Sequence, residues 1–201
     1  MVLMDIDAYW KSQWESFCPH FSKGVARVNL HSYGGPDAHF KMLPGGGFGD
    51  LSHPTTKLCL TQICKLQNQT SSFIDIGCGS GVLSLAAHCL GFSPIFSIDI
   101  EDAAIAHIKK NSLLNNAPIT VGKTINSNKM DSPVIVMNMI EMESSVAWKS
   151  CSSLHNKPKT LITSGILTQH KQRYLNNIPP SFGRLTFETS TQGWSLFVFK
   201  S

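Results

Sequence analysis

The chain has 201 residues, 42% of them hydrophobic, and its 17 Lys and Arg against 13 Asp and Glu give a formal net charge of +4. This length supports one full hydrophobic core, because two domains of similar size would leave both cores thin. No apolar run reaches the roughly 20 residues that cross a bilayer, and the start of the chain lacks the basic and apolar regions of a signal peptide. We therefore expect a single cytoplasmic domain over residues 1–201, with no membrane partner.

Aromatic residues recur at near-helical spacing early in the chain, at Tyr9, Trp10, Trp14 and Phe17. This spacing predicts a helix with one apolar face. We interpret residues 1–42 as an N-terminal segment that packs against the main core.

A loop rich in Gly and Pro follows, with the sequence Leu43-Pro44-Gly45-Gly46-Gly47-Phe48-Gly49-Asp50. An amphipathic run from Lys57 to Leu66 comes next, and Thr55 or Thr56 stands where a helix begins. We expect residues 43–57 to form a glycine-rich loop and residues 58–201 to form an α/β core.

Short apolar runs alternate with helical patterns from residue 73 onward, which indicates β-α units and a parallel sheet. We expect strands at 73–76, 95–100, 119–121, 134–138 and 160–164. We expect the intervening helices at 82–90, 102–115 and 143–154, where Gly91 and Asn115-Asn116 end the first two.

Two further apolar runs, 184–190 and 194–199, flank a turn at Gly193 and predict a terminal hairpin. The fold class is therefore α/β, with a Rossmann-like sheet of seven strands. We expect this sheet to be mostly parallel, with helices on both faces and an antiparallel last strand.

The run from Phe73 to Val82, with the sequence FIDIGCGSGV, predicts a buried strand, a glycine turn and the start of a helix. Gly77 and Gly79 lack the Cβ that would keep a ligand from the backbone, and the helix directs its N-terminal amides at the same point. This arrangement favours a nucleotide-like ligand. A dinucleotide fingerprint needs a third glycine at position 82, which is Val, so a nicotinamide or flavin cofactor is disfavoured.

Asp99 stands at the tip of the second predicted strand of this sheet. A carboxylate there can accept hydrogen bonds from both hydroxyls of a ribose. Glu101 shares its side-chain parity and is the alternative, although Glu101 also suits the cap of the helix that follows.

An acidic residue before G-x-G-x-G resembles motif I of class I S-adenosylmethionine-dependent methyltransferases. The run from Pro44 to Leu60, PGGGFGDLSHPTTKLCL, is similar to the P-G-x-A-F-G-T-G-x-H-x-T-T-x-L-C-L segment of the PrmA family of bacterial ribosomal-protein methyltransferases. Further similar pieces follow in the same order, at Asp75 to Gly81, Ile98 to Glu101, Asn138 to Ile140, Ser164 to Leu167, and Trp194. The resemblance covers almost the whole chain.

This resemblance implies a class I methyltransferase that binds S-adenosyl-L-methionine through the loop at 43–57 and the glycine turn. Thr56 would lie near the methionine end of the cofactor, and Asp75, Gly77 and Gly79 would form the turn. Asp99 would hold the ribose, and Asn138 would lie beside the sulfonium as a catalytic residue.

Three departures from the family pattern bear on the acceptor. We expect the catalytic domain to begin almost at residue 1, without the family's separate N-terminal substrate-recognition domain. Gly49-Asp50-Leu51-Ser52 replaces G-T-G-x, and Glu141 replaces a small residue. The stretch after the third predicted strand also offers no Asp for the adenine amine, so we expect the backbone or Asn126 to make that contact.

The first expectation for the acceptor is a protein amine, of the ribosomal type that the family implies. Transfer from a sulfonium needs alignment more than a nucleophilic triad, and His53, Glu141 and Glu143 are the candidates for assisting a proton. His53 also suits an ordering role in the glycine-rich loop. A small-molecule or RNA methyltransferase on the same core is the second hypothesis, and a non-catalytic cofactor-binding protein is the third.

The segment between Ser144 and Phe187 has six basic residues and no acid, namely Lys149, Lys157, Lys159, Lys171, Arg173 and Arg184. They indicate either a surface for RNA or an acidic protein, or an ordinary solvated surface. The six cysteines form no C-x-x-C pair, and His53, Cys59 and Cys64 lack the spacing of metal ligands. We therefore expect reduced thiols and no metal.

Overall fold

The computed structural model describes residues 6–18, 20–49, 51–66, 71–125 and 130–201. Its main feature is a sheet of seven strands in the order β5-β4-β3-β6-β7-β9-β8. These strands are β3 (Phe73–Ile76), β4 (Ile95–Ile98), β5 (Ile119–Gly122), β6 (Val134–Asn138), β7 (Thr160–Leu167), β8 (Arg184–Thr191) and β9 (Trp194–Lys200). The five strands β5, β4, β3, β6 and β7 run parallel to one another, and β9 is antiparallel to both β7 and β8. This arrangement confirms the predicted fold class.

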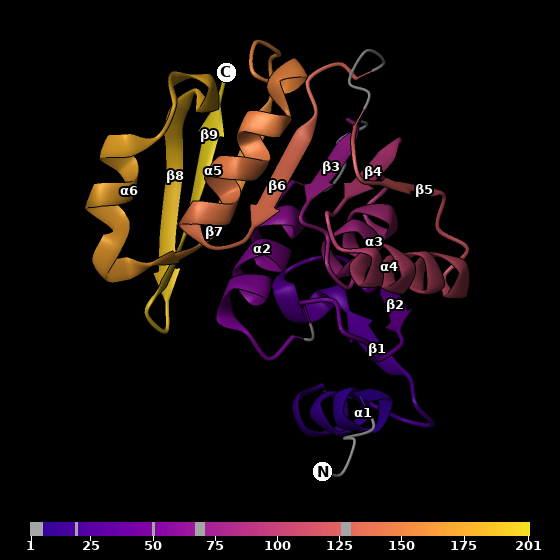
Figure 1. Cartoon of the computed structure of the whole chain (residues 1–201). Helices are drawn as coiled ribbons and strands as arrows, with labels where there is room; N and C mark the ends of the chain where they lie inside the picture. Colours follow the sequence, from indigo (N-terminus) through magenta and orange to yellow (C-terminus); the bar gives the residue numbers. More distant parts are fainter. Residues whose placement is uncertain (1–5, 19, 50, 67–70, 126–129) are drawn as a thin grey trace.

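Helices cover both faces of this sheet (Figure 1). They are α2 (Pro54–Cys64), α3 (Val82–Cys89), α4 (Asp102–Leu114), α5 (Glu141–Ser150) and α6 (Lys171–Asn177), whereas α1 (Ile6–Phe17) lies apart from the sheet, below it in the view of Figure 1. Short 3-10 turns lie at Leu30–Tyr33, Ser152–Leu154, Thr168–His170 and Pro180–Phe182.

The central strand β6 shows how the chain builds its two cores. Val134 and Val136 point into the core that α2 and α3 cover, whereas Ile135 and Met137 point into the core that contains Trp148 of α5. Successive side chains of a strand alternate between faces, so a strand covered on both sides is apolar throughout. This is why β3 and β6 are apolar apart from Asp75 and Asn138, and both strands were predicted with their observed bounds.

Two strand ends differ from the prediction by more than one residue, whereas β5, β8 and β9 each end one residue later than predicted. β4 ends at Ile98 rather than at residue 100, because Asp99 turns its carboxylate to backbone amides and Ile100 is 82% exposed. β7 continues past Ser164 to Leu167, with an irregularity in its pairing to β9 where Gly165 adopts a φ of +94°. Both differences lie at the carboxyl edge of the sheet.

The helices between the strands agree with the prediction except for the last. α3 and α4 end within one residue of the expected positions, and Gly91 and Asn116 that follow them have positive φ. The helix expected at 143–154 begins earlier, at Glu141, and ends at Ser150. Its remaining residues form a 3-10 turn.

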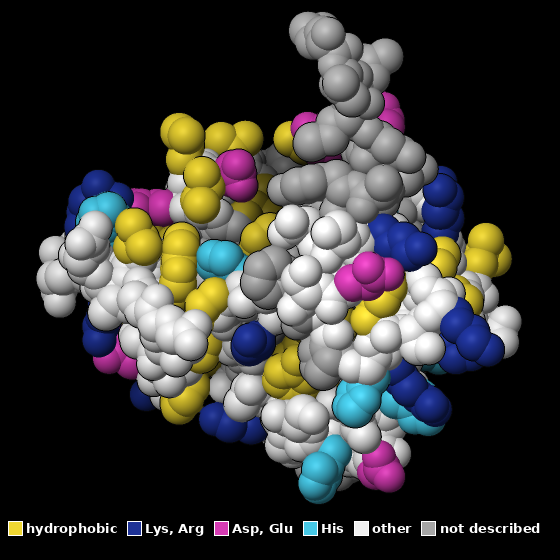
Figure 2. Space-filling view, turned by 90° about the horizontal axis from the view of Figure 1, so that it is seen from below, with side chains coloured by type: hydrophobic (Ala, Val, Ile, Leu, Met, Phe, Trp, Pro, Cys, Tyr) yellow, Lys and Arg dark blue, Asp and Glu magenta, His cyan; other side chains and the backbone are white. Residues whose placement is uncertain are grey.

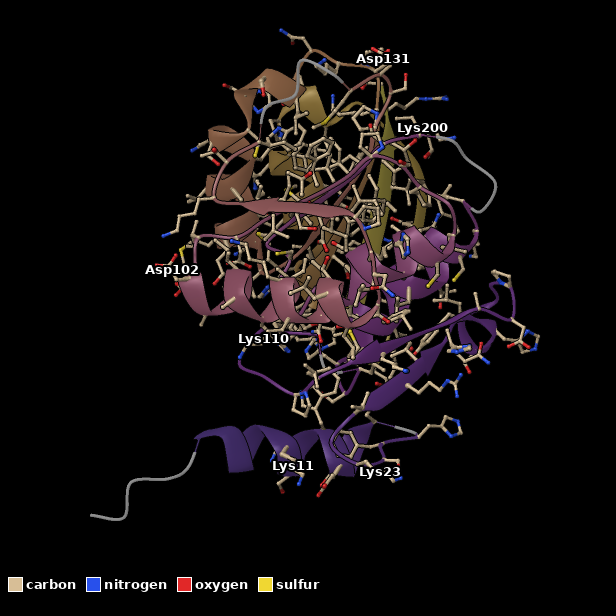
Figure 3. The ribbon with its side chains drawn as sticks, turned by 90° about the vertical axis from the view of Figure 1, so that its right-hand side faces the viewer. Lys11, Lys23, Asp102, Lys110, Asp131 and Lys200 are labelled. Carbon is tan, nitrogen blue, oxygen red and sulfur yellow. The ribbon has the colours of Figure 1, made fainter. Side chains whose placement is uncertain are left out.

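The N-terminal segment contains α1 and a hairpin of β1 (Ala26–Asn29) and β2 (His39–Met42), which the sequence pattern did not predict. Figure 3 shows α1, which carries Lys11, next to this hairpin. The Trp14 side chain is fully buried and meets the ring of His107 edge to face at 6.4 Å. The side chains of Tyr9, Trp10 and Phe17 lie outside the described residues.

Candidate functional site

A cavity of about 860 Å³ opens at the carboxyl edge of the sheet, where β3, β4 and β6 end. Figure 2 views the molecule from this side, toward which the arrow of β6 points in Figure 1. Among the predicted site residues, Gly77, Gly79, Asp99 and Asn138 line it. Ligands of open α/β sheets bind at this edge, so the cavity is the candidate site.

The glycine-rich loop and the glycine turn form one wall of the cavity through direct backbone contact. The amide of Ser80 donates to the carbonyl of Phe48 at 2.8 Å, and the Ser80 hydroxyl donates to the carbonyl of Gly49 at 3.1 Å. A Cβ at Gly47 would lie 2.5 Å from the carbonyl carbon of Gly79, and a Cβ at Gly79 would lie 2.5 Å from the Phe48 oxygen. The two segments can therefore approach this closely only because Gly47 and Gly79 have no Cβ.

Two side chains of α4 hold this wall in place, and sequence reasoning missed both. The Gly47 amide donates to Nδ1 of His107 at 3.2 Å, so the imidazole is the tautomer whose Nε2 donates to the Leu43 carbonyl at 2.8 Å. Asn111 accepts from the Leu43 amide at 2.8 Å and donates to the Ser80 carbonyl at 2.9 Å. Burial lowers the pKa of His107, which favours the neutral ring that this arrangement needs.

Asp99 joins the end of β4 to the glycine turn. Its Oδ2 accepts from the amide of Gly79 at 3.0 Å, and its Oδ1 accepts from the amide of Glu101 at 3.0 Å. Each carboxylate oxygen keeps a further lone pair, so the group can still accept hydroxyl protons from a ligand. The exposed side chain of Glu101 also lines the cavity and makes no cap hydrogen bond to α4.

Asn138 is the last residue of β6 and is 9% exposed at the cavity wall. Its Oδ1 has no hydrogen-bond partner among the described residues. A buried acceptor without a partner costs about 1 to 3 kcal/mol. This oxygen is therefore suited to a donor that a ligand brings.

The first turn of α2 reaches the cavity at Thr55 rather than at Thr56. His53 caps this helix, because its Nδ1 accepts from the Thr55 amide at 3.3 Å and lies 2.8 Å from the Thr55 hydroxyl. The Thr56 hydroxyl is fully buried and lacks a hydrogen-bond partner in the described part of the chain. The free amides of a helix N-terminus favour an anion such as a carboxylate.

Asp75 does not reach the cavity. It is 1% exposed and its Oδ2 accepts from the Ser84 hydroxyl at 2.6 Å, which in turn lies 2.7 Å from the hydroxyl of Ser97. Burial raises the pKa of Asp75 to about 7, against the opposing hydrogen bond from Ser84. The structure therefore separates Asp75 from the other predicted site residues.

The candidates for proton assistance occupy three different surroundings. The His53 ring lies edge to face with Phe48 at 5.4 Å and with Trp194 at 4.8 Å, in keeping with an ordering role in the loop. Glu143 is exposed at the cavity, whereas Glu141 pairs with Arg173 at 2.5 Å. Asn126, expected near the adenine, lies outside the described residues.

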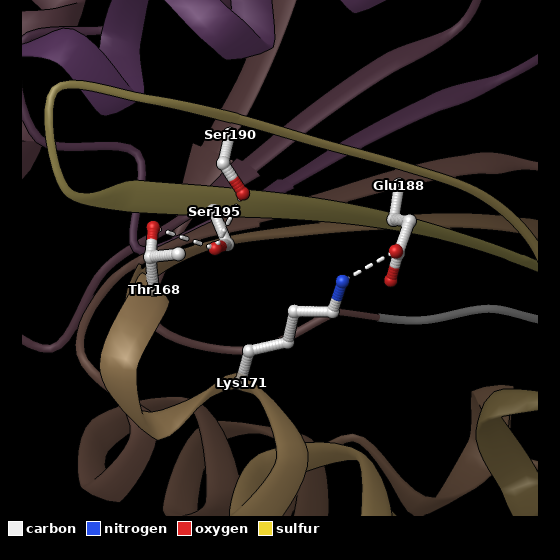
Figure 4. A network of polar contacts seen from close by, with 5 residues as sticks. All are labelled: Thr168, Lys171, Glu188, Ser190 and Ser195. Carbon is white, nitrogen blue, oxygen red and sulfur yellow. Dashed lines mark hydrogen bonds and ion pairs between the residues drawn. The ribbon is translucent and has the colours of Figure 1, made fainter.

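The basic residues between Ser144 and Phe187 do not form one face. Lys159 is 3% exposed, and its ammonium group donates to the carbonyls of His155 and Lys157. Lys171 pairs with Glu188, beside hydroxyl contacts that join Thr168, in the 3-10 turn before α6, to the terminal hairpin (Figure 4). Lys157 donates to the carbonyl of Met130 at 3.2 Å, and Arg173 pairs with Glu141. Four of the six basic residues are therefore engaged within the fold.

No group of three or more His, Cys, Asp and Glu side chains in the described ranges is placed to hold a metal ion. Within these ranges, none of the helices combines the length and the apolar character that a membrane crossing requires.

The strand order with its antiparallel β9, the glycine turn after β3 and the acid after β4 define a Rossmann-like fold of the class I methyltransferase type. Within this class, the chain belongs to the ribosomal protein L11 methyltransferase (PrmA) family, whose sequence model matches residues 7–201. The predicted family resemblance is therefore confirmed.

Curated relatives agree with this assignment. A ribosomal protein L11 methyltransferase of Legionella pneumophila (strain Corby) is 33% identical over 169 residues, which make up 83% of this chain and 58% of the relative. One from Staphylococcus carnosus is 25% identical over 199 residues, or 94% of this chain and 64% of the relative. The chain thus spans about three fifths of the length of these relatives.

Solved structures share the fold. The ribosomal protein L11 methylase of Lactobacillus delbrueckii subsp. bulgaricus superimposes with a TM-score of 0.65 at 23% identity, covering 78% of this chain and 82% of the other. A tRNA methyltransferase of B. subtilis superimposes with a TM-score of 0.53 at 16% identity, covering 70% and 64%. The fold alone therefore does not decide the acceptor.

Proposed function

We propose that this chain is an S-adenosyl-L-methionine-dependent methyltransferase that acts on an amine of a protein, with a ribosomal protein in the cytoplasm as its substrate. Family membership supports the reaction class. The observation that carries the proposal is the Asp99 carboxylate, bonded to the glycine turn at the edge of a cavity where Asn138 presents an unpartnered oxygen. We propose that residues 1–201 work as one catalytic domain.

The residues at the cavity fit this cofactor. Asp99 would accept the two ribose hydroxyls, and Gly77 and Gly79 would let the nucleoside approach the backbone. The first turn of α2 would face the methionine carboxylate, with Thr55 at the cavity wall and the adjacent Thr56 buried within the same turn. Asp75 would support the site without touching the cofactor, because its hydrogen bond to Ser84 holds α3 against β3.

S-adenosyl-L-methionine, when bound, supplies a methyl group that is already activated as a sulfonium. The chain's own task is alignment and control of the acceptor's proton. Asn138 Oδ1 would accept an N–H of the acceptor amine and direct the nitrogen lone pair at the methyl carbon. The apolar wall formed with Met139 and Trp194 would favour the neutral amine, because desolvation lowers the pKa of an ammonium group.

The structure offers no observation that favours RNA over protein as the acceptor. Nucleic-acid surfaces need clustered positive charge, and four of the six basic residues noted above are engaged within the fold. We therefore keep the protein amine as the proposed acceptor.

Calorimetric titration with S-adenosylhomocysteine tests the cofactor assignment. We expect one molecule to bind per chain, with NADH as a control nucleotide that does not bind. If S-adenosylhomocysteine releases no heat of binding and does not raise the melting temperature, the proposal is wrong.

A further inference from the structure

A second cavity, of about 720 Å³, adjoins the first between α5, α6 and the end of β7. The two cavities share a wall of five residues, which are Ile140, Met142, Val146, Gly165 and Trp194. A group bound in the second cavity therefore lies next to a group bound in the first.

The two cavities differ in charge. The first is lined by Asp99, Glu101 and Glu143 against Lys123 alone, and Lys123 pairs with Asp102 at 2.8 Å. This negative lining suits a cationic sulfonium and an amine that arrives as ammonium.

The second cavity is lined by two cations, Lys149 and Arg173, together with His170, against the single acid Glu141. Its lining has the opposite sign to that of the first cavity. Electrostatic complementarity of this kind selects partners and orients them on approach.

The cations of the second cavity have N–H groups that are free to donate hydrogen bonds to a ligand. Lys149 is exposed and has no hydrogen-bond or ion-pair partner among the residues that the structure describes. Arg173 donates one N–H to Glu141 at 2.5 Å, and a guanidinium group has five N–H donors. The bound Glu141 shows that a carboxylate fits against Arg173 at this point.

Exposed apolar side chains lie at the wall between the cavities. Ile140 is 47% exposed, Met142 73% and Val146 65%. Figure 2 shows hydrophobic and acidic side chains gathered over α5 at the upper left of this face. A contiguous exposed apolar patch of this kind marks an interaction surface.

We propose that the second cavity binds an acidic side chain of the protein that is methylated. The enzyme then recognises three features of one segment of the substrate protein. These are an amine bound in the first cavity, an apolar side chain packed on α5, and an acidic side chain bound by Lys149 and Arg173. This inference rests on the proposed function, and it names the substrate class as a lysine with an acidic residue close to it in the chain.

Synthetic peptides with one lysine test this inference. In one series Glu stands two to six residues from the lysine, and matched peptides carry Gln or Arg at the same position. Peptide affinity is measured by fluorescence anisotropy with saturating S-adenosylhomocysteine, and methyl transfer is measured separately. The variants are Lys149→Glu and, as a control, Lys200→Glu, which reverses the charge of an exposed lysine at the opposite edge of the sheet (Figure 3).

At the best spacing, wild type should bind the Glu peptide about fivefold more tightly than the Gln peptide, the size expected of a partly exposed charge pair. The Lys149→Glu variant should instead prefer the Arg peptide, while Lys200→Glu keeps the wild-type order. Affinity for S-adenosylhomocysteine should be equal in all three proteins.

Equal affinity for Glu and Gln peptides at every spacing overturns the inference, and intact S-adenosylhomocysteine binding then shows that the proposed function is not at fault. Methylation of free glutamate in preference to every peptide would also overturn it, in favour of a small-molecule acceptor. Loss of S-adenosylhomocysteine binding in wild type would overturn the proposed function and this inference together.

Discussion

The carboxylate of Asp99 accepts a hydrogen bond from the backbone amide of Gly79 at 3.0 Å, which ties the end of β4 to the turn that follows β3. The acid is thus held at the cavity by the chain's own backbone before any ligand binds. A side chain positioned in advance loses less conformational entropy on binding, which raises affinity.

This relationship predicts that Asp99, rather than Glu101, is the ribose acceptor. Asp99→Ala should weaken S-adenosylhomocysteine binding by at least about tenfold, since hydrogen bonds to a charged group are worth about 1.5 to 3 kcal/mol. Glu101→Ala should change the affinity by less than about twofold. Calorimetry measures the affinity of both variants for S-adenosylhomocysteine. A larger loss of affinity in Glu101→Ala than in Asp99→Ala would assign the ribose to Glu101.

Because the Asn138 oxygen has no hydrogen-bond partner in the described part of the chain, replacing Asn138 should lower activity without lowering stability. Asn138→Ala should lower kcat by about tenfold or more, because the amine loses its acceptor, whereas the melting temperature should stay level or rise. Asn115→Ala is the contrast, because the Asn115 amide bonds to the backbone of Lys41 and Asn111. That change should lower the melting temperature. A joint loss of activity and stability in Asn138→Ala would mark Asn138 as structural.

The clamp that His107 places on Gly47 predicts a pH-dependent cofactor affinity. Burial lowers the pKa of His107 below its ordinary 6.5, so the clamp is complete at neutral pH and is lost as the pH falls through the lowered value. Protonation would turn Nδ1 into a donor that faces the Gly47 amide, which is also a donor.

Titrating S-adenosylhomocysteine between pH 7.5 and 5 should therefore show falling affinity in wild type. His107→Ala should bind weakly at every pH, with a flatter profile. His31→Ala, which removes an exposed histidine outside the cavity, should keep the wild-type profile. Wild-type affinity that stays constant over this range would contradict the clamp.

Asp75 predicts a pH dependence of folding stability. Its pKa is raised from 3.8 to about 7 by burial, so the folded state holds a proton that the unfolded state releases above pH 4. The stabilisation is full below about pH 4 and declines as the pH rises toward and past 7. Between pH 4.5 and 6.5 the free energy of unfolding should fall by about 1.4 kcal/mol per pH unit more steeply in wild type than in Asp75→Asn.

Urea denaturation at a series of pH values measures this difference. Ser84→Ala is the matched variant, because the Ser84 hydrogen bond lowers the pKa of Asp75. Without this hydrogen bond the pKa of Asp75 should rise further, so the free energy of unfolding should continue to fall up to a higher pH than in wild type. Parallel curves for wild type and Asp75→Asn would contradict a neutral buried Asp75.

The parts of the fold that the sequence predicts are those with a strong local pattern. The runs at β3 and β6 are apolar apart from Asp75 and Asn138, and the glycine turn between Gly77 and Gly81 has a recognisable sequence signature. The hairpin of β1 and β2 was missed because its strands have four residues each, with a 3-10 turn between them. α6 was missed because Tyr174 is its single buried residue, which leaves no apolar period to detect.

Two of the predicted site residues, Asp99 directly after β4 and Asn138 at the end of β6, line the cavity because the carboxyl ends of neighbouring parallel strands meet at one edge of the sheet. His107 and Asn111 were missed because they bond to backbone groups of Leu43 and Gly47, which lie 60 to 68 residues away. Every residue has such backbone groups, so the sequence does not show which of them a side chain will bind. Thr55 and Thr56 are adjacent hydroxyl residues, and the capping by His53 decides which of them meets the cavity.

The most direct test of the proposed function follows the methyl group itself. The protein is incubated with methyl-labelled S-adenosyl-L-methionine and separated ribosomal proteins, RNA and metabolites from its own source, with Asn138→Ala run in parallel. We predict label in a protein band, on lysine or an N-terminal amine after hydrolysis, and about tenfold less with the variant. Label in RNA or metabolites with protein unlabelled, or no transfer by a protein that binds S-adenosylhomocysteine, would contradict the account.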